Sequence, residues 1–373
     1  MLKRLYIDNY KCMVNFEFVP QGIQLILGAN GTGKSSIFDV LLLLRRFITG
    51  QEKLAKLLEP SSLTRWDKRI QQTFELDLEG NEGLYNYKLV VEHKIETNQT
   101  RVRSETLQFQ GQPLLKFVDG EVTIYREESH KIGAAFSFDW SQSALVTLSE
   151  RKDNQLHRWF RDWIGQVQVI RINPFDMKSQ TDQEQTLLLK NATNFASWYR
   201  HLIQESPELI EDIRKSLTNV WNGFRGLRLE KAGSNTRILK ATLDAGVHSE
   251  EADYELALEE LSDGQRTLIV LYTLLHYVRQ VPCPLVCIDE PDNFISLEEI
   301  QPWLVSLCQT VEDRGSQALL ISHHPELINY LAPQDAVLFS RADGGLTRVK
   351  AFHSVPGSTL PPAEVISRGW DGE

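Results

Sequence analysis

Residues 28–35 read GANGTGKS, and this stretch decides the fold. It matches the P-loop pattern GxxxxGK[ST], with the apolar run GIQLIL (22–27) before it and the apolar stretch SIFDVLLLLRRFITG (36–50) after it. A strand, a glycine-rich turn and a helix in this order let backbone N–H groups point at phosphate oxygens beside the positive end of a helix. In such a loop Lys34 reaches the β- and γ-phosphates and Ser35 offers its hydroxyl to Mg²⁺. We therefore expect a site for ATP with Mg²⁺.

A second motif, LSDGQ at residues 261–265, opens an apolar helix. Ser262 and Gln265 have the spacing of a capping box, which starts a helix. A helix start is also an anion site when it faces a phosphate. The pentapeptide by itself leaves both interpretations open.

Two later apolar strands each end in a polar pair. LVCIDEP (285–291) ends in Asp289 and Glu290, and LLISHHP (319–325) ends in His323 and His324. In an open α/β sheet the carboxyl ends of the strands line the ligand crevice. One carboxylate can serve Mg²⁺, the next can polarise a water, and a histidine can contact the γ-phosphate. The acidic pair alone could also be an ordinary strand-end turn, and a histidine at a strand end is more often structural.

Taken together, the four motifs resemble those of the ABC ATPase superfamily, with LSDGQ as its signature, CIDEP as its Walker B strand and SHHPE as its switch-histidine segment. Transporter subunits keep the interval between the loop lysine and the signature much shorter than it is here. The opening LKRLYIDNYKCM (2–13) is similar to the start of RecF and SMC heads. The chain thus resembles the compact RecF/SMC/OLD-like ATPases. We expect neither the SMC coiled coil nor a nuclease domain in it.

This resemblance implies a role for each matching residue. Glu290 is the general base and His323 the switch histidine, with His324 as the second choice, while Asn173 is the candidate for the family's Mg-contacting glutamine. Asp289 and Ser35 orient Mg²⁺. The nucleotide contacts comprise Asn30, Gly31, Thr32, Gly33, Lys34, Ser35, Ser36 and Lys11, and from the signature Ser262, Gly264 and Gln265.

The expected fold class is α/β: a P-loop NTPase head of the ABC type with a β-rich antiparallel insert and a helical lobe before the signature. Segments between residues 70 and 150 alternate apolar and polar residues with period two, which predicts an antiparallel meander. Residues 183–223 have helical periodicity, and strands and helices alternate over 262–350. We expect an N-terminal ATPase lobe (1–180), a helical lobe (181–260) and a C-terminal ATPase lobe (261–373).

Composition limits which cellular location and which partners we expect for the protein. No apolar run approaches the roughly 20 residues of a membrane span, and the N-terminus lacks the apolar core of a signal peptide, so we expect a cytoplasmic protein without a membrane partner. The four cysteines form no CxxC pair, so we expect neither zinc nor a disulfide.

The net charge of −10 argues against a protein that coats DNA through its bulk charge. Local DNA contact stays open through two basic clusters: Arg65, Lys68 and Arg69, and Arg151, Lys152, Arg158 and Arg161. The alternative is a solvated surface.

The resemblance implies a homodimer in which one protomer's loop holds ATP and its partner's signature covers the γ-phosphate. Our leading hypothesis is an ATP-dependent dimeric switch that regulates a separately encoded effector, a nuclease or toxin, in phage defence or DNA repair. The alternatives are the energy subunit of a membrane transporter and a non-catalytic ATP-sensing scaffold.

Overall fold

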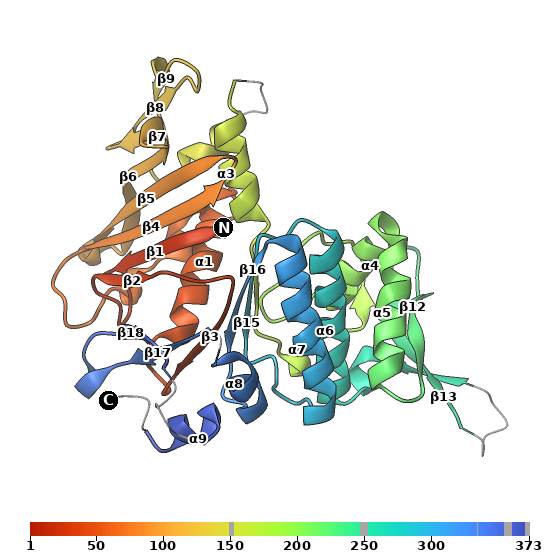
Figure 1. Cartoon of the computed structure of the whole chain (residues 1–373). Helices are drawn as coiled ribbons and strands as arrows, with labels where there is room; N and C mark the ends of the chain where they lie inside the picture. The colour runs from red at the N-terminus through yellow and green to blue at the C-terminus, as the bar shows by residue number, and fades with distance from the viewer. Residues whose placement is uncertain (149–152, 247–252, 334, 354–359, 370–373) are drawn as a thin grey trace. The chain divides into compact units, whose positions relative to one another are not determined.

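The computed structural model describes residues 1–148, 153–246, 253–333, 335–353 and 360–369, and the chain forms two compact units (Figure 1). The first unit comprises Met1–Val167 with Asp335–His353, and the second comprises Gln168–Gln334 with Ser354–Glu373. The three lobes expected from the sequence stay a prediction, since the compact units divide the chain at other positions.

An eight-stranded antiparallel sheet dominates the first unit, in the order β2-β1-β4-β5-β6-β7-β8-β9. Its core face follows from the alternation along each strand: Phe74, Leu76 and Leu78 of β4 are buried, while Glu75 on the other face pairs with Lys88 of β5. Strands β1 and β2 pair as an antiparallel hairpin, and the predicted meander is confirmed. The strands are β1 (Leu2–Asp8), β2 (Phe16–Phe18), β4 (Gln71–Gly80), β5 (Gly83–Lys94), β6 (Gln99–Phe109), β7 (Gln112–Val118), β8 (Glu121–Tyr125) and β9 (Ile132–Ser137).

A smaller set of strands in the same unit carries the glycine-rich loop. The buried strand β3 (Ile23–Gly28) runs parallel to β17 (Ala336–Ser340), which pairs with β18 (Arg348–Ala351) in an antiparallel hairpin. Helix α1 (Lys34–Ile48) begins directly after the loop, and most of its residues are buried. Two further helices are α2 (Leu54–Leu57) and α3 (Gln155–Gly165).

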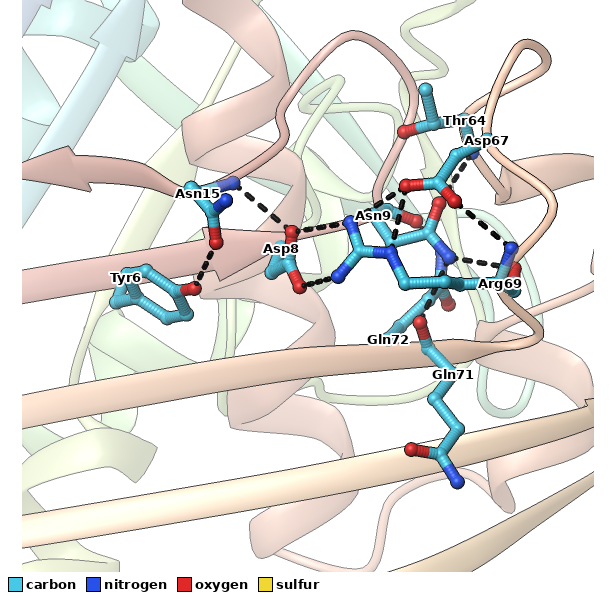
Figure 2. Close-up of polar contacts among 9 residues, drawn as sticks. All are labelled: Tyr6, Asp8, Asn9, Asn15, Thr64, Asp67, Arg69, Gln71 and Gln72. Atoms are coloured by element: carbon cyan, nitrogen blue, oxygen red, sulfur yellow. Dashed lines mark hydrogen bonds and ion pairs between the residues drawn. The ribbon is translucent and has the colours of Figure 1, made fainter.

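Polar side chains fix the loop that leads into β4 (Figure 2). The Asn9 side chain donates from Nδ2 to the carbonyl oxygens of Arg69 and Gln71, both at 2.8 Å. The Arg69 guanidinium donates to both oxygens of Asp8, at 2.6 and 3.1 Å, and pairs with Asp67 at 2.6 Å. Two carboxylates therefore compensate the charge of Arg69.

Two small sheets and a helical layer build the second unit. Parallel strands β10 (Gln168–Ile170), β15 (Leu285–Asp289) and β16 (Gln317–Ile321) pair in that order. A four-stranded sheet holds β11 (Gln180–Thr181), β12 (Phe224–Lys231), β13 (Arg237–Asp244) and β14 (Asp253–Ala257). The helices are α4 (Phe195–Glu205), α5 (Pro207–Val220), α6 (Asp263–Gln280), α7 (Leu297–Arg314), α8 (Pro325–Leu331) and α9 (Pro362–Ser367).

Helix α6 is the centre of the helical layer and lies between α5 and α7 (Figure 1). Trp303 of α7 donates from Nε1 to the carbonyl oxygen of Leu271 in α6 at 3.0 Å, and Ser216 of α5 hydrogen-bonds His276 of α6 at 2.8 Å. Buried apolar side chains on most of its length hold α6 in place. Within the described ranges, no helix is long and apolar enough to cross a membrane.

One helical prediction extends too far toward the N-terminus. Residues 183–194, expected to be helical, form an irregular segment, and the helix begins at Phe195. The reason is the Asn194 side chain, which accepts from the Leu189 N–H at 2.9 Å and donates to the Leu187 carbonyl oxygen at 2.9 Å. These bonds satisfy the backbone in a non-helical path. Strand β10 ends at Ile170, and the N–H of the next residue, Arg171, donates to the Lys190 carbonyl oxygen at 2.6 Å.

Replacement of Gly28 by alanine tests the close approach of β3 to β17. Gly28 has φ 138°, and a Cβ there would lie 2.2 Å from the carbonyl oxygen of Phe339, so Gly28→Ala should lower the free energy of unfolding by about 2 kcal/mol or more. Thermal unfolding measures the change. Gly22→Ala is the matched control, because nothing lies within 4 Å of its Cβ position. Equal melting temperatures for the two variants would contradict the close approach.

Candidate functional site

The glycine-rich loop adopts the backbone that a phosphate cradle requires. Gly28, Gly31 and Gly33 have φ values of 138°, 81° and 95°, in the region that favours glycine. The loop leads into the N-terminus of α1, where Ser36 donates from its N–H to the Gly33 carbonyl oxygen at 3.0 Å. The predicted strand–loop–helix order is confirmed.

Lys34 lies within this loop rather than on the outer surface. Its Nζ donates to the carbonyl oxygens of Gly28 at 2.6 Å and Ala29 at 3.0 Å, and Lys34 is 7% exposed. Ser35 is half-buried beside it, while Asn30 and Gly31 are exposed. A cation, a hydroxyl and a helix N-terminus at one turn are the donor set that a polyphosphate with Mg²⁺ requires, so these residues fit such a ligand.

The β17–β18 hairpin packs against the glycine-rich loop and supports it. Thr347 donates from Oγ1 to the Thr32 carbonyl oxygen at 2.9 Å and from its N–H to the Cys12 carbonyl oxygen at 3.1 Å. A Cβ at Gly33 would lie 3.0 Å from Cys12 Sγ and 3.1 Å from Thr347 Oγ1. Gly33 is therefore needed for packing as well as for its backbone angle.

Lys11 is engaged in an ion pair in the first unit. Its Nζ lies 2.8 Å from Asp39 Oδ2 in α1 and 5.1 Å from the centre of the Tyr10 ring. Burial lowers the pKa of Lys11, but Tyr10 and Asp39 raise it by a larger amount, so the net pKa is raised. A nucleotide contact by Lys11 stays a prediction.

In the second unit the acidic pair stands at the end of β15, with Asp289 as the last residue of the strand and Glu290 directly after it. Asp289 is 2% exposed at the end of the strand. Glu290 leaves the strand with φ 55° and donates from its N–H to the Ile321 carbonyl oxygen at 2.8 Å. A non-glycine residue at positive φ is uncommon, and such strain is concentrated at functional sites.

Two donors hold the carboxylate of Glu290. Arg171 Nη2 lies 3.1 Å from Glu290 Oε2, and Asn293 Nδ2 lies 3.0 Å from the same oxygen. Arg171 Nε also lies 3.9 Å from Asp289 Oδ2. Sequence reasoning missed Arg171, although it directly follows a strand that runs beside β15. Asn173, the suggested glutamine counterpart, donates from Nδ2 to Asp176 Oδ2 at 2.6 Å, and its role stays a prediction.

The signature segment forms the predicted capping box. Ser262 donates from its N–H to Gln265 Oε1 at 2.9 Å, and Gln265 donates from its N–H to Ser262 Oγ at 3.2 Å. Ser262 is exposed at the start of α6. A Cβ at Gly264 would lie 2.5 Å from the Phe294 carbonyl oxygen, so this position needs glycine. The helix start is thus capped and still presents its N-terminus.

The two neighbouring histidines, His323 and His324, differ in their surroundings. His324 caps α8, since its Nδ1 accepts from the Glu326 N–H at 3.3 Å, and its own N–H donates to Ser322 Oγ at 2.9 Å. His323 is exposed after the end of β16. This arrangement favours His323 as the residue that would reach a phosphate, and its role stays a prediction.

The basic clusters carry less uncompensated charge than their sequence suggests. Arg69 is paired with two carboxylates (Figure 2), and Arg158 donates to Asp162 at 3.2 Å. Arg161 donates to the Leu148 carbonyl oxygen at 3.1 Å. Arg151 and Lys152 lie outside the described residues.

The loop residues from Asn30 to Ser36 and Lys11 thus lie in the first unit, and the acidic pair, signature and histidines lie in the second.

Residues 25–329 match the family described as "AAA domain, putative AbiEii toxin, Type IV TA system", and the chain belongs to this family. No curated protein matches the chain.

Two solved structures are similar to the chain over nearly its whole length. One is an Smc head bound to the C-winged helix domain of ScpA, with 13% identity, a TM-score of 0.56 and coverage of 94% of this chain and 96% of that chain. The other is an Smc head with an extended coiled coil bound to the C-terminal domain of ScpA, from Pyrococcus furiosus, with 10% identity, a TM-score of 0.52 and coverage of 99% and 98%. This likeness shows the fold. Family and fold together place the chain among P-loop ATPases with a fold like that of SMC heads, and the residues that the structure describes form no long coiled coil.

Lys34→Ala tests the loop as a nucleotide site. Because the variant loses the cation inside the loop, Mg-ATP should no longer raise its melting temperature, whereas the parent should gain several degrees. Differential scanning fluorimetry with and without Mg-ATP measures both. Lys88→Ala, at an exposed lysine of the same unit, is the control and should keep the parental shift. A parental shift in Lys34→Ala would rule out this loop as the site.

Proposed function

We propose that this chain binds Mg-ATP, hydrolyses it in a head-to-tail homodimer, and acts as a switch on a separately encoded effector. The observation that carries the proposal is the position of Lys34, whose amino group lies among the loop carbonyls at the start of α1. A buried lysine at this place in a glycine-rich loop fits a polyphosphate better than any other ligand class.

The catalytic roles follow from the two sets of residues. Lys34 and the loop N–H groups would bind the phosphates, and Ser35 and Asp289 are each proposed as a ligand of Mg²⁺, which would neutralise phosphate charge. Glu290 accepts a proton from the attacking water as its oxygen bonds to the terminal phosphorus and the bond to the ADP oxygen breaks. His323 is exposed and contacts the terminal phosphate from the end of β16.

The start of α6 supports the dimer. Ser262 is exposed, and a helix N-terminus carries a positive partial charge that favours a phosphate. Ser262, Gly264 and Gln265 of one protomer then cover the ATP held by its partner. Two such contacts related by a two-fold axis complete two sites at once.

The effector role rests on similarity to other proteins. It also follows from our proposal, which assigns ATP hydrolysis as the one reaction of this chain. The Smc heads in the similar structures are bound to ScpA, a protein partner. The matching family is described with the terms toxin and TA system. We propose a nuclease or toxin as the partner, in phage defence or DNA repair, and a shape change between nucleotide states as the signal.

Glu290→Gln should trap the dimer. The glutamine keeps the size of the side chain but cannot accept the proton, so ATP should bind, turnover should fall at least about a hundredfold, and a dimer should accumulate. Light scattering with Mg-ATP measures the mass. Adding Ser262→Arg should return the protein to monomer, because an arginine adds bulk at the start of α6. Parental turnover in Glu290→Gln would place the base elsewhere.

The effector proposal predicts a partner that depends on nucleotide. Tagged protein with Glu290→Gln, expressed in its native host and purified with Mg-ATP, should co-elute with one protein at near-equal amounts, and Lys34→Ala should not retain it. Mass spectrometry of the two eluates identifies the partner. Elution without a partner in every state, together with ATP turnover stimulated by DNA, would support a self-sufficient repair role instead.

A further inference from the structure

The eight-stranded sheet of the first unit ends in an open edge strand. Strand β9 pairs with β8 on one side, and no strand among the described residues pairs with its other side (Figure 1). All six residues of β9 are exposed, with Ile132 at 63% and Phe136 at 39%. Natural proteins commonly protect such an edge with charges or proline, because its unpaired N–H and C=O groups can bind another strand. The sequence of β9, IGAAFS, contains neither.

The pairing with β8 determines which residues of β9 face outward. The Phe138 N–H, just after the strand, donates to the Gly120 carbonyl oxygen at 2.8 Å. Positions that bond to the neighbour alternate along an antiparallel pair, so Ala135 and Ser137 direct their N–H and C=O groups away from β8. The irregularity in this pairing lies toward the start of β9, where Gly133 is an extra residue. The rest of β9 therefore forms a regular strand with a free outer edge.

A second copy of β9 can pair with this edge in antiparallel orientation. Two copies related by a two-fold axis bring outward residues opposite outward residues, so the axis passes through a residue rather than between two. An axis through Ala135 places Gly133 opposite Ser137 and Ala134 opposite Phe136. The side chains at the centre of such a pairing are small, so the two backbones can approach to hydrogen-bonding distance.

Charges at the two ends of β9 select this position of the axis. With the axis through Ala135, Lys131 stands opposite Asp139 of the second copy, once at each end of the pairing. A shift of the axis by one residue in either direction places Lys131 opposite a serine instead. Lys131 is exposed, and the Asp139 side chain is 45% exposed although it also lies 3.6 Å from Lys53. Opposite charges across a strand pair stabilise it, so the edge is complementary to itself.

We propose that β9 is a docking surface for a second copy of this chain, and that two β9 strands pair about Ala135 to join two eight-stranded sheets. This contact needs no nucleotide and does not rest on the proposed ATPase function. One pair of strands buries less surface than a standard interface, so the dissociation constant should be about 10–100 µM. A dimer formed with ATP carries two β9 edges, so the same contact would link such dimers at high protein concentration.

Sedimentation equilibrium of the full chain without nucleotide tests the pairing. The parent should change from monomer to dimer between about 1 and 300 µM. Ala135→Lys and Ala135→Glu should each raise the dissociation constant at least about tenfold, because the axis brings two like charges together. An equimolar mixture of the two variants should form dimers within about threefold of the parental affinity, because each lysine then faces a glutamate.

Leu84→Lys is the matched control, since Leu84 is a 39% exposed residue of β5 in the same sheet. It should keep the parental dissociation constant, and equal melting temperatures should show that the Ala135 variants fold. A parent that stays monomeric over the whole range, or charge variants that dimerise as the parent does, would overturn the proposal. Loss of the dimer in both charge variants without recovery in their mixture would also refute pairing about Ala135.

Discussion

The parallel pairing of β3 with β17 is the constraint on which the glycine-rich loop depends. Gly28 ends β3 opposite Phe339, and no side chain fits between them, because a Cβ would lie 2.2 Å from the Phe339 carbonyl oxygen. That approach lets the chain turn with φ 138° straight into the loop. Lys34 then bonds back to the carbonyl oxygens of Gly28 and Ala29, so the position of the amino group follows from the strand pairing.

A second constraint operates at the acidic pair. The bond between the Glu290 N–H and the Ile321 carbonyl oxygen holds Glu290 at φ 55° and directs its side chain out of the strand. Asp289 is the last residue of β15 and is buried, while Glu290 is directed toward Arg171 and Asn293. Two adjacent carboxylates thus obtain different surroundings, as a metal ligand and a base require.

Patterns of neighbouring residues made many of the strands and helices predictable. The features that were not predicted depend on contacts that such patterns do not show. The alternation in β4 and β5 identified the meander, and the loop sequence identified the start of α1. Strand β9 was missed because all six of its residues are exposed and show no alternation. The pair between Arg171 and Glu290 joins residues 119 positions apart, and no spacing rule connects them. Asn194 likewise delays the start of a helix to Phe195 through side-chain bonds that periodicity does not show.

The long sequence separation between the loop and its support also affects the order of folding. Strands β4 to β9 pair with their neighbours in sequence, so this meander can form from local contacts soon after synthesis. The loop at residues 28–35 is supported in part by β17 and Thr347, more than 300 residues later. Domains form during synthesis from the N-terminus onward, at about 5–20 residues per second. Until residues 336–347 have been synthesised the loop lacks its supporting strand, so the nascent chain gains its nucleotide-binding geometry only after that point.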